Sequence, residues 1–356
     1  MRTIGLHPHR VCASVRRSAL LVAFALPSCA VEPTVDPSLY VASGFTDQVF
    51  QLDAASGAVV ETFSLDVRRA ETDEPHALER DPRGRFWYVS LAHGDPTLWK
   101  YEVGSNRLVG RVALGTAGAG RIGITPDGTR AFIPDYYRSG GALRSEVAVV
   151  RLETLDVIER LTICVAPHDA KVDPSGALVA IACSKSDEIV VLDVATLQER
   201  NRFFVAADPG DPGFPRYRPL NLVWSPAGDR LYVALQKTSE VRAFTREGAL
   251  RDQVSVGAGP AQLAISRDGR MLATANRGDG SLSIVELPEL AERARVPLGV
   301  AHPHGITLAP DGRRAFVTYE GDTSTPGGVV AVDVTQREVV WETVAGAFTL
   351  GIIYVP

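Results

Sequence analysis

A four-residue turn sequence recurs six times along the chain and constrains its fold more than any other feature. Proline presets the backbone angle of the first central residue of a type I turn, and glycine accepts the left-handed conformation that follows. The copies lie 44, 48, 52, 41 and 43 residues apart, so we expect a protein built from repeats of that length. The copies end in Gly84, Gly128, Gly176, Gly228, Gly269 and Gly312, and five of the six carry Pro two residues before the Gly.

Short apolar runs follow the turns in a regular order. The first run comes directly after the turn, as at 86–89, 178–181 and 231–233, and a later run ends in an acidic residue, as at 189–193 and 329–333. Four short strands joined by tight turns form one blade of a β-propeller. The sequence therefore predicts an all-β propeller made of four-stranded antiparallel blades.

The two ends of the repeat region are incomplete and complement each other. Residues 39–65 supply the second to fourth strands of a blade but lack its first strand, and residues 349–356 match 303–310, the start of another repeat, in phase. We expect the C-terminal strand to complete the N-terminal blade, which closes a ring of seven blades and leaves no long open sheet edge. The predicted propeller domain is 39–356.

The first 28 residues have the composition of a signal peptide. Their apolar stretch, 18–26, is too short to span a bilayer as a helix. The sequence Leu26-Pro27-Ser28-Cys29 resembles a bacterial lipobox, in which Cys29 is lipidated and residues 29–38 form a tether. Pro27 departs from the usual residue there, and cleavage after Ala30 is the alternative. The basic residues of the segment are Arg2, Arg10, Arg16 and Arg17.

The charge of the mature chain limits its partners. Removing residues 1–28 removes four Arg and no acid, so 33 basic and 42 acidic residues remain, and the net charge of −5 becomes −9. A negative charge without basic runs argues against nucleic-acid binding. We expect an exported monomer, periplasmic or at the cell surface, that contacts the membrane through its lipid anchor alone.

The repeat motifs resemble those of the YVTN-type seven-bladed propellers, which are typically bacterial and extracytoplasmic. The matching pieces are the start Pro303-His-Gly-Ile306, turns such as Ala309-Pro-Asp-Gly312, and Leu231-Tyr-Val-Ala234. The resemblance extends over nearly all of 39–356. It implies the fold, but many members have no assigned activity, so it implies no single function.

Three histidines occupy one position of the repeat, next to its start. His76, His168 and His304 each follow a Pro and precede the turn by six residues. We expect the first strand of each blade to be innermost, which puts the three imidazoles around one mouth of the central channel. His93 and His302 fall on the same face, where the long insertions 66–74, 134–146, 206–218 and 321–328 also lie.

This ring of histidines has two interpretations. Imidazoles around one opening are ligands for copper or zinc, and the Pro-His starts look like those of the nitrous oxide reductase and selenium-binding propellers, which use histidines at the channel mouth for copper. There is no separate copper domain, however, and there are far fewer His residues than a clustered copper centre needs. The alternative is a structural role, with the imidazoles bonded to water and neighbouring backbone.

Cys164 and Cys183 remain as a pair once Cys12 and Cys29 are assigned to the exported leader and its lipid site. An even pair in an exported protein indicates one disulfide or two buried thiols. Because Cys183 ends the second strand of the blade that holds His168, a Cys/His metal site is the alternative.

Several polar residues fall near the channel mouth by alignment of the repeats. Asp169 and Glu320 are candidates for a general acid or base beside a His, and the resembling propellers that act as lactonases use His, Glu and Arg there. The alternative role is to satisfy strand ends and hold channel water. The others of this group are Asp135, Asn276 and Tyr319.

Two functions follow from these patterns. The first is a binding or scaffold module that presents its long-loop face to an envelope protein, a glycan or a small ligand. It predicts exposed aromatic residues there, namely Tyr136, Tyr137, Phe214 and Tyr217. The second is a metal-binding, oxidoreductase-like or lactonase-like propeller with a His site at the channel mouth.

Overall fold

The computed structural model describes residues 36–66, 71–136 and 142–356. Within these ranges the chain forms seven antiparallel four-stranded sheets and no helix, as the sequence predicts. The described residues contain no helix that is long and apolar enough to cross a membrane. The predicted signal peptide 1–28, Cys29 and the tether as far as residue 35 lie outside the described residues.

Six of the sheets are built from consecutive strands. In chain order they are β4 (Pro75–Arg80), β5 (Phe86–Leu91), β6 (Thr97–Glu102) and β7 (Leu108–Ala113); β8 (Gly123–Ile124), β9 (Arg130–Pro134), β10 (Arg144–Arg151) and β11 (Asp156–Val165); β12 (Pro167–Val172), β13 (Leu178–Cys183), β14 (Glu188–Asp193) and β15 (Glu199–Phe204); β16 (Pro219–Trp224), β17 (Arg230–Leu235), β18 (Glu240–Thr245) and β19 (Leu250–Ser255); β20 (Pro260–Ile265), β21 (Met271–Asn276), β22 (Ser281–Glu286) and β23 (Ala291–Pro297); and β24 (Pro303–Leu308), β25 (Arg314–Tyr319), β26 (Gly328–Asp333) and β27 (Glu338–Val344).

The seventh sheet joins the two ends of the propeller. Its order is β28 (Thr349–Val355), β1 (Ser38–Ser43), β2 (Gln48–Asp53) and β3 (Val59–Ser64). Strand β28 pairs antiparallel with β1 in a register that places Val355 opposite Ser38 and Ile352 opposite Val41. This confirms that the C-terminal strand closes the ring.

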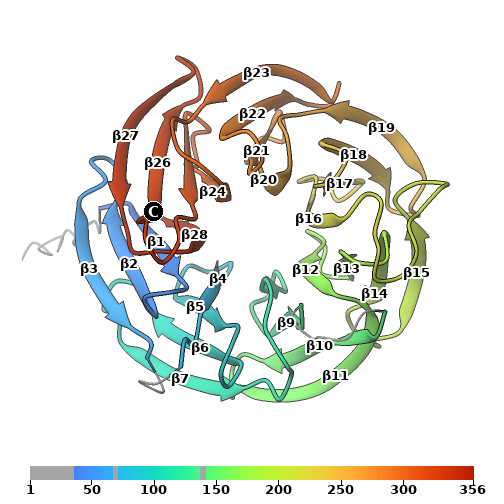
Figure 1. Ribbon diagram of the computed structural model, residues 1–356. Helices are drawn as coiled ribbons and strands as arrows, with labels where there is room; N and C mark the ends of the chain where they lie inside the picture. Colours follow the sequence, from blue (N-terminus) through green and yellow to red (C-terminus); the bar gives the residue numbers. More distant parts are fainter. Residues whose placement is uncertain (1–35, 67–70, 137–141) are drawn as a thin grey trace, which may run out of the picture. The chain divides into compact units, whose positions relative to one another are not determined.

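The sheets stand around a central channel, with the first strand of each blade innermost and the fourth on the circumference (Figure 1). Burial follows this order: β13 and β17 are buried along nearly their whole length, whereas β3 and β19 are mostly exposed. Apolar clusters fill the spaces between neighbouring blades. In one of them the rings of Trp87 and Tyr101 stack 4.1 Å apart and Tyr40 of the adjacent blade packs against Trp87.

The repeated turns have the geometry that the sequence predicts. The glycine that ends each of the six turns has a φ between 68° and 76°, the left-handed region that glycine occupies at least cost. Its amide donates to the carbonyl three residues earlier at 2.8 or 2.9 Å. These turns join the first and second strands, so they all lie on one face, and the opposite face carries the ends that hold the histidines.

Candidate functional site

A pocket of about 440 Å³ opens where the innermost strands begin. His76 of β4, His168 of β12 and His304 of β24 all line it. Leu220 and Leu350, at the same repeat position in β16 and β28, line it as well. The structure therefore brings together the three histidines that the sequence places at the channel mouth.

His304 is bound to a carboxylate through one ring nitrogen. Its Nδ1 lies 2.8 Å from Oε1 of Glu320, and no hydrogen-bond partner among the described residues reaches its buried Nε2. Burial lowers the pKa of His304, and the bond to Glu320 opposes this only in part. A neutral imidazole that donates from Nδ1 keeps a lone pair on Nε2, so His304 can accept a proton in the pocket.

Glu320 is held in place from two sides. Arg277 donates to it in bidentate fashion, from Nε to Oε1 and from Nη2 to Oε2, each at 2.6 Å. Burial by itself raises the pKa of Glu320, but the hydrogen bonds from His304 and Arg277 hold it at about 2. The carboxylate is therefore charged across the physiological range and fixes the orientation of the imidazole.

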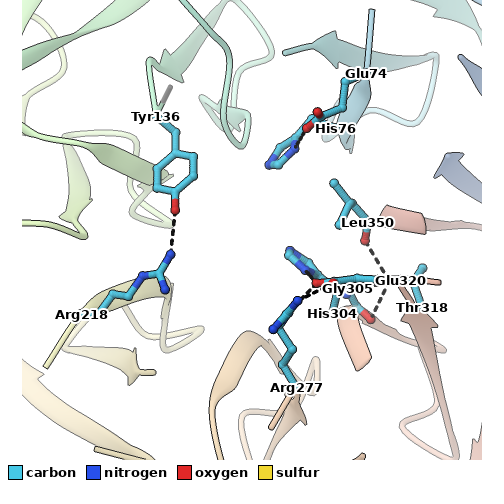
Figure 2. Close-up of polar contacts among 10 residues, drawn as sticks. All are labelled: Glu74, His76, Tyr136, Arg218, Arg277, His304, Gly305, Thr318, Glu320 and Leu350. Carbon is cyan, nitrogen blue, oxygen red and sulfur yellow. Dashed lines mark hydrogen bonds and ion pairs between the residues drawn. The ribbon is translucent and has the colours of Figure 1, made fainter. Parts of the chain in front are cut away.

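These three side chains come from two blades and lie next to one another in Figure 2. Glu320 directly follows β25 of the blade that holds His304, and Arg277 directly follows β21 of the preceding blade. Gly305 sets the position of His304, since a Cβ there would lie 2.1 Å from the carbonyl oxygen of Leu350 in the next blade. Thr318 accepts from the amide of Gly305 at 2.7 Å and donates to that same carbonyl at 2.9 Å.

His168 occupies the equivalent position in a different environment. Its Nδ1 lies 2.7 Å from the carbonyl oxygen of Leu220, and the ring of Tyr136 meets its ring edge-on at 4.5 Å. Burial lowers the pKa of His168 well below its ordinary value, and the charges of His76 and His304 lower it further. This imidazole stays neutral and is held by backbone and an aromatic ring.

His76 and His93 share a carboxylate. Nδ1 of His76 lies 3.3 Å from Oε1 of Glu74, and Nε2 of His93 lies 3.0 Å from Oε2. The hydrogen bond to Glu74 raises the pKa of His93, which is nearly half exposed and does not line the pocket. Asp47 positions this group because its carboxylate accepts from the backbone amides of Asp73 and Glu74.

A second arginine faces the pocket from the insertion 206–218. Nη2 of Arg218 donates to the hydroxyl of Tyr136 at 2.8 Å, to the left of Arg277 in Figure 2. The carboxylate of Asp187 fixes this insertion. It is fully buried and accepts from the backbone amides of Gly210, Arg216, Tyr217 and Arg218 at 2.7 to 3.2 Å.

The remaining polar candidates do not line the histidine pocket. Asp169 is fully buried and does not line the pocket; it accepts from the Asn221 side chain at 2.6 Å, and burial raises its pKa. Asp135 accepts from a loop amide, Asn276 donates to two serines, and Tyr319 lines an adjoining pocket together with His302. Asp169, Asp135 and Asn276 are thus bonded to other groups of the protein.

The aromatic residues expected on the long-loop face differ in exposure. Phe214 is 79% exposed, and Tyr136 is partly buried in the pocket. The prediction for Tyr217 is wrong: it is 8% exposed, because its hydroxyl donates to Asp208 and its ring packs under Arg242. Tyr137 lies outside the described residues.

Cys164 and Cys183 are joined by a disulfide whose Cα atoms are 5.9 Å apart.

In the described ranges, no group of three or more His, Cys, Asp or Glu side chains is placed to hold a metal ion. The rings of His76 and His168 lie 6.2 Å apart between centroids, and each of the three pocket histidines turns Nδ1 toward a protein acceptor. We therefore derive no chemical step through copper or zinc.

Three further residues line the pocket that the sequence did not predict there, namely Arg277, Arg218 and Gln236. A signal was present for two of them. Gln236, Arg277 and Glu320 each directly follow the second strand of a blade, so they share a repeat position just as the histidines do. Arg218 directly precedes Pro219, the residue that starts its blade.

A comparison with known protein families identifies the family to which this chain belongs. The model of the lactonase family, described as a seven-bladed β-propeller, matches residues 48–341. The chain therefore belongs to this family. A comparison with curated proteins gave no significant match.

Solved structures share the propeller fold at low sequence identity. The periplasmic gluconolactonase of Pseudomonas aeruginosa superposes with a TM-score of 0.70 at 21% identity, covering 90% of this chain and 99% of that one. A putative 6-phosphogluconolactonase of Bacteroides fragilis gives 0.69 at 15% identity, covering 91% and 99%. Hydrazine synthase of Kuenenia stuttgartiensis gives 0.60 at 16% identity, covering 70% and 80%. At these identities the similarity concerns the fold.

Proposed function

We propose that the protein is a hydrolase that opens a lactone ring in the histidine pocket. The observation that carries this proposal is His304, whose Nδ1 is bound to a charged Glu320 while its Nε2 has no partner among the described residues. Membership of the lactonase family and the gluconolactonase among the similar structures support it. The same pocket favours hydrolysis over the binding or scaffold role expected from the sequence.

The first step is general-base attack on the lactone carbonyl. Nε2 of His304 takes a proton from water, the water oxygen bonds to the carbonyl carbon, and the carbonyl π electrons move onto its oxygen. Glu320 stabilises the imidazolium that forms and keeps the ring oriented. The guanidinium groups of Arg277 and Arg218 line the same pocket, and their positive charge stabilises the oxyanion.

The second step breaks the ring. The oxyanion reforms the carbonyl, the bond between the carbonyl carbon and the ring oxygen cleaves, and the leaving alkoxide takes the proton back from Nε2 of His304. The product is a hydroxy acid, which loses its carboxyl proton to solvent at neutral pH. One water is consumed, and His304 returns to its neutral form.

We also propose that the protein works in the periplasm, anchored through a lipid on Cys29. The signal-like segment 1–28 and the periplasmic location of the Pseudomonas relative support export. Replacement of Cys29 by Ala should release the protein from the membrane fraction into the soluble periplasm. An unchanged membrane fraction in this variant would contradict lipidation at Cys29.

Lactone hydrolysis by the purified protein tests the proposal. After subtraction of the spontaneous reaction, we expect kcat/KM to rise with pH through a midpoint below 6.5, because burial lowers the pKa of His304, and then to level off. Glu320→Gln should lower kcat about 100-fold, since a mis-oriented imidazole is a poor base. Rates no higher than the spontaneous reaction for sugar lactones and simple γ-lactones would overturn the proposal.

A further inference from the structure

A second pocket adjoins the histidine pocket at the wall that Arg277 and Glu320 form. It has a volume of about 580 Å³ and shares Arg277, Glu320 and Phe348 with its neighbour. It lies between the blade of β24 and the blade of β28 on the long-loop face. A molecule whose carbonyl lies at His304 can therefore extend past Phe348 into this second space.

The second pocket is lined largely by aromatic and aliphatic groups. The rings of Phe45 and Phe348 stack 4.5 Å apart and nearly parallel, at 14°, and we call this pair the aromatic shelf. Phe45 is 41% exposed. Val300, Ala301 and Pro326 line the same space.

Three charged groups that line this pocket are already bonded within the protein. Arg277 and Glu320 bind each other. The carboxylate of Asp322 accepts from the amide and hydroxyl of Ser324 and from the amide of Thr325 at 2.7 to 2.8 Å. The large apolar surface of the shelf remains in contact with water, so covering it with an apolar group releases free energy.

Closure of the propeller ring places the shelf. The amide of Gly44 donates to the carbonyl of Phe348 at 2.9 Å, and the amide of Phe45 donates to Ala347 at 3.1 Å. The amide of Thr349 donates to the carbonyl of Glu320 at 3.0 Å. The shelf and the carboxylate that orients His304 are thus tied to one backbone segment and hold a fixed mutual position before any ligand binds.

We propose that the aromatic shelf binds an apolar substituent, alkyl or aryl, carried by the lactone ring that His304 opens. This inference rests on the proposed function and adds a substrate class to it. Phe348 lines both pockets, so a substituent that extends past this ring lies on the shelf while the carbonyl stays at His304. Each methylene group buried there contributes at most about 0.8 kcal/mol, or about fourfold in kcat/KM.

A series of γ-lactones tests the shelf. We expect kcat/KM to rise from γ-butyrolactone through γ-hexalactone and γ-octalactone to γ-decalactone, by up to about fourfold per added methylene. Phe45→Ala should flatten this rise, so that the ratio of kcat/KM for γ-decalactone to kcat/KM for γ-butyrolactone falls toward one, because Phe45 lines the second pocket and not the histidine pocket. Leu250→Ala, which removes an exposed apolar side chain from the outer strand β19, is the matched control and should keep the full rise.

Binding of a non-hydrolysable analogue separates this inference from the proposed function. A 3-alkylcyclopentanone presents a ring carbonyl and an alkyl chain at the position that corresponds to the γ carbon of the lactone, but it has no ester bond to cleave. Calorimetry should give tighter binding of 3-hexylcyclopentanone than of cyclopentanone to the wild type, and Phe45→Ala should remove the difference. Equal binding of the two ketones, or a chain-length rise that survives Phe45→Ala, overturns the shelf whether or not lactones are hydrolysed.

Discussion

His304 and His168 share a repeat position, yet the two sides of the pocket around them are built differently. On one side, charged groups surround His304, with Glu320 on its Nδ1 and Arg277 on Glu320. On the other side, His168 donates to a backbone carbonyl and packs against Tyr136. Burial keeps both imidazoles neutral, but only the first has a carboxylate to stabilise the imidazolium that a general base must become.

Two residues at one repeat position can therefore have different roles. The propeller places each imidazole at the channel mouth through its innermost strand, and the residue that follows the second strand decides the chemistry. That residue is Glu320 beside His304 and Ser184 in the blade of His168. His304 and its partners therefore carry the proposed catalysis, and His168 supports the structure on the other side of the pocket.

Loss of the disulfide beside His168 should give the largest effect on stability. The bond between Cys164 and Cys183 closes a loop with a sequence separation of 19 and should contribute about 3 kcal/mol to the free energy of unfolding. Denaturant unfolding of Cys164→Ala/Cys183→Ala measures this. Non-reducing mass spectrometry of the wild type provides the control, and two free thiols there would contradict the bond.

Removal of Arg277 should lower the catalytic efficiency that depends on His304. Arg277→Gln leaves the buried Glu320 without its bidentate partner, so we expect kcat/KM to fall about 100-fold, or about 2.7 kcal/mol. Arg293→Gln, which removes a surface ion pair with Glu286 on an outer strand, is the control and should be neutral. Equal activity of the two variants would contradict the proposal that the His304 side of the pocket carries catalysis.

The neutral state of His168 should make the protein sensitive to acid. Its folded pKa lies well below 6.5, so the unfolded chain binds the extra proton first and stability falls as pH drops below about 6.5, by up to about 1.4 kcal/mol per pH unit. His168→Gln should reduce this loss between pH 6.5 and 5 in thermal unfolding. An unchanged pH dependence would mean that His168 is not the group responsible.

The insertion that carries Arg218 should give the smallest effect. Asp187→Asn weakens the hydrogen bonds from four backbone amides, so Arg218 becomes less fixed and we expect KM for a lactone to rise about fivefold with kcat little changed. Arg218→Gln should raise KM at least as much. A fall in kcat without a change in KM in Asp187→Asn would contradict a positioning role.

The sequence predicted the fold because the turn chemistry repeats. Six turns that end in Gly, five of them with Pro two residues earlier, and the phase match of 349–356 with 303–310 are local features that can be read from the chain itself. The histidines were placed correctly for the same reason, since the innermost strand fixes their position. The pairing of Glu320 with Arg277 joins two blades, and the position of Arg218 depends on Asp187, so both follow from packing that one sequence does not display.

Side-by-side kinetics of His304→Gln and His168→Gln test the central claim most directly. Both substitutions replace an imidazole at the same repeat position by an uncharged side chain, so they differ only in the side of the pocket affected. With a lactone that the wild type hydrolyses, we predict that kcat falls by about 100-fold to 10,000-fold in His304→Gln and by less than about tenfold in His168→Gln. Equal losses in the two variants, or an active His304→Gln, would contradict the assignment of His304 as the general base.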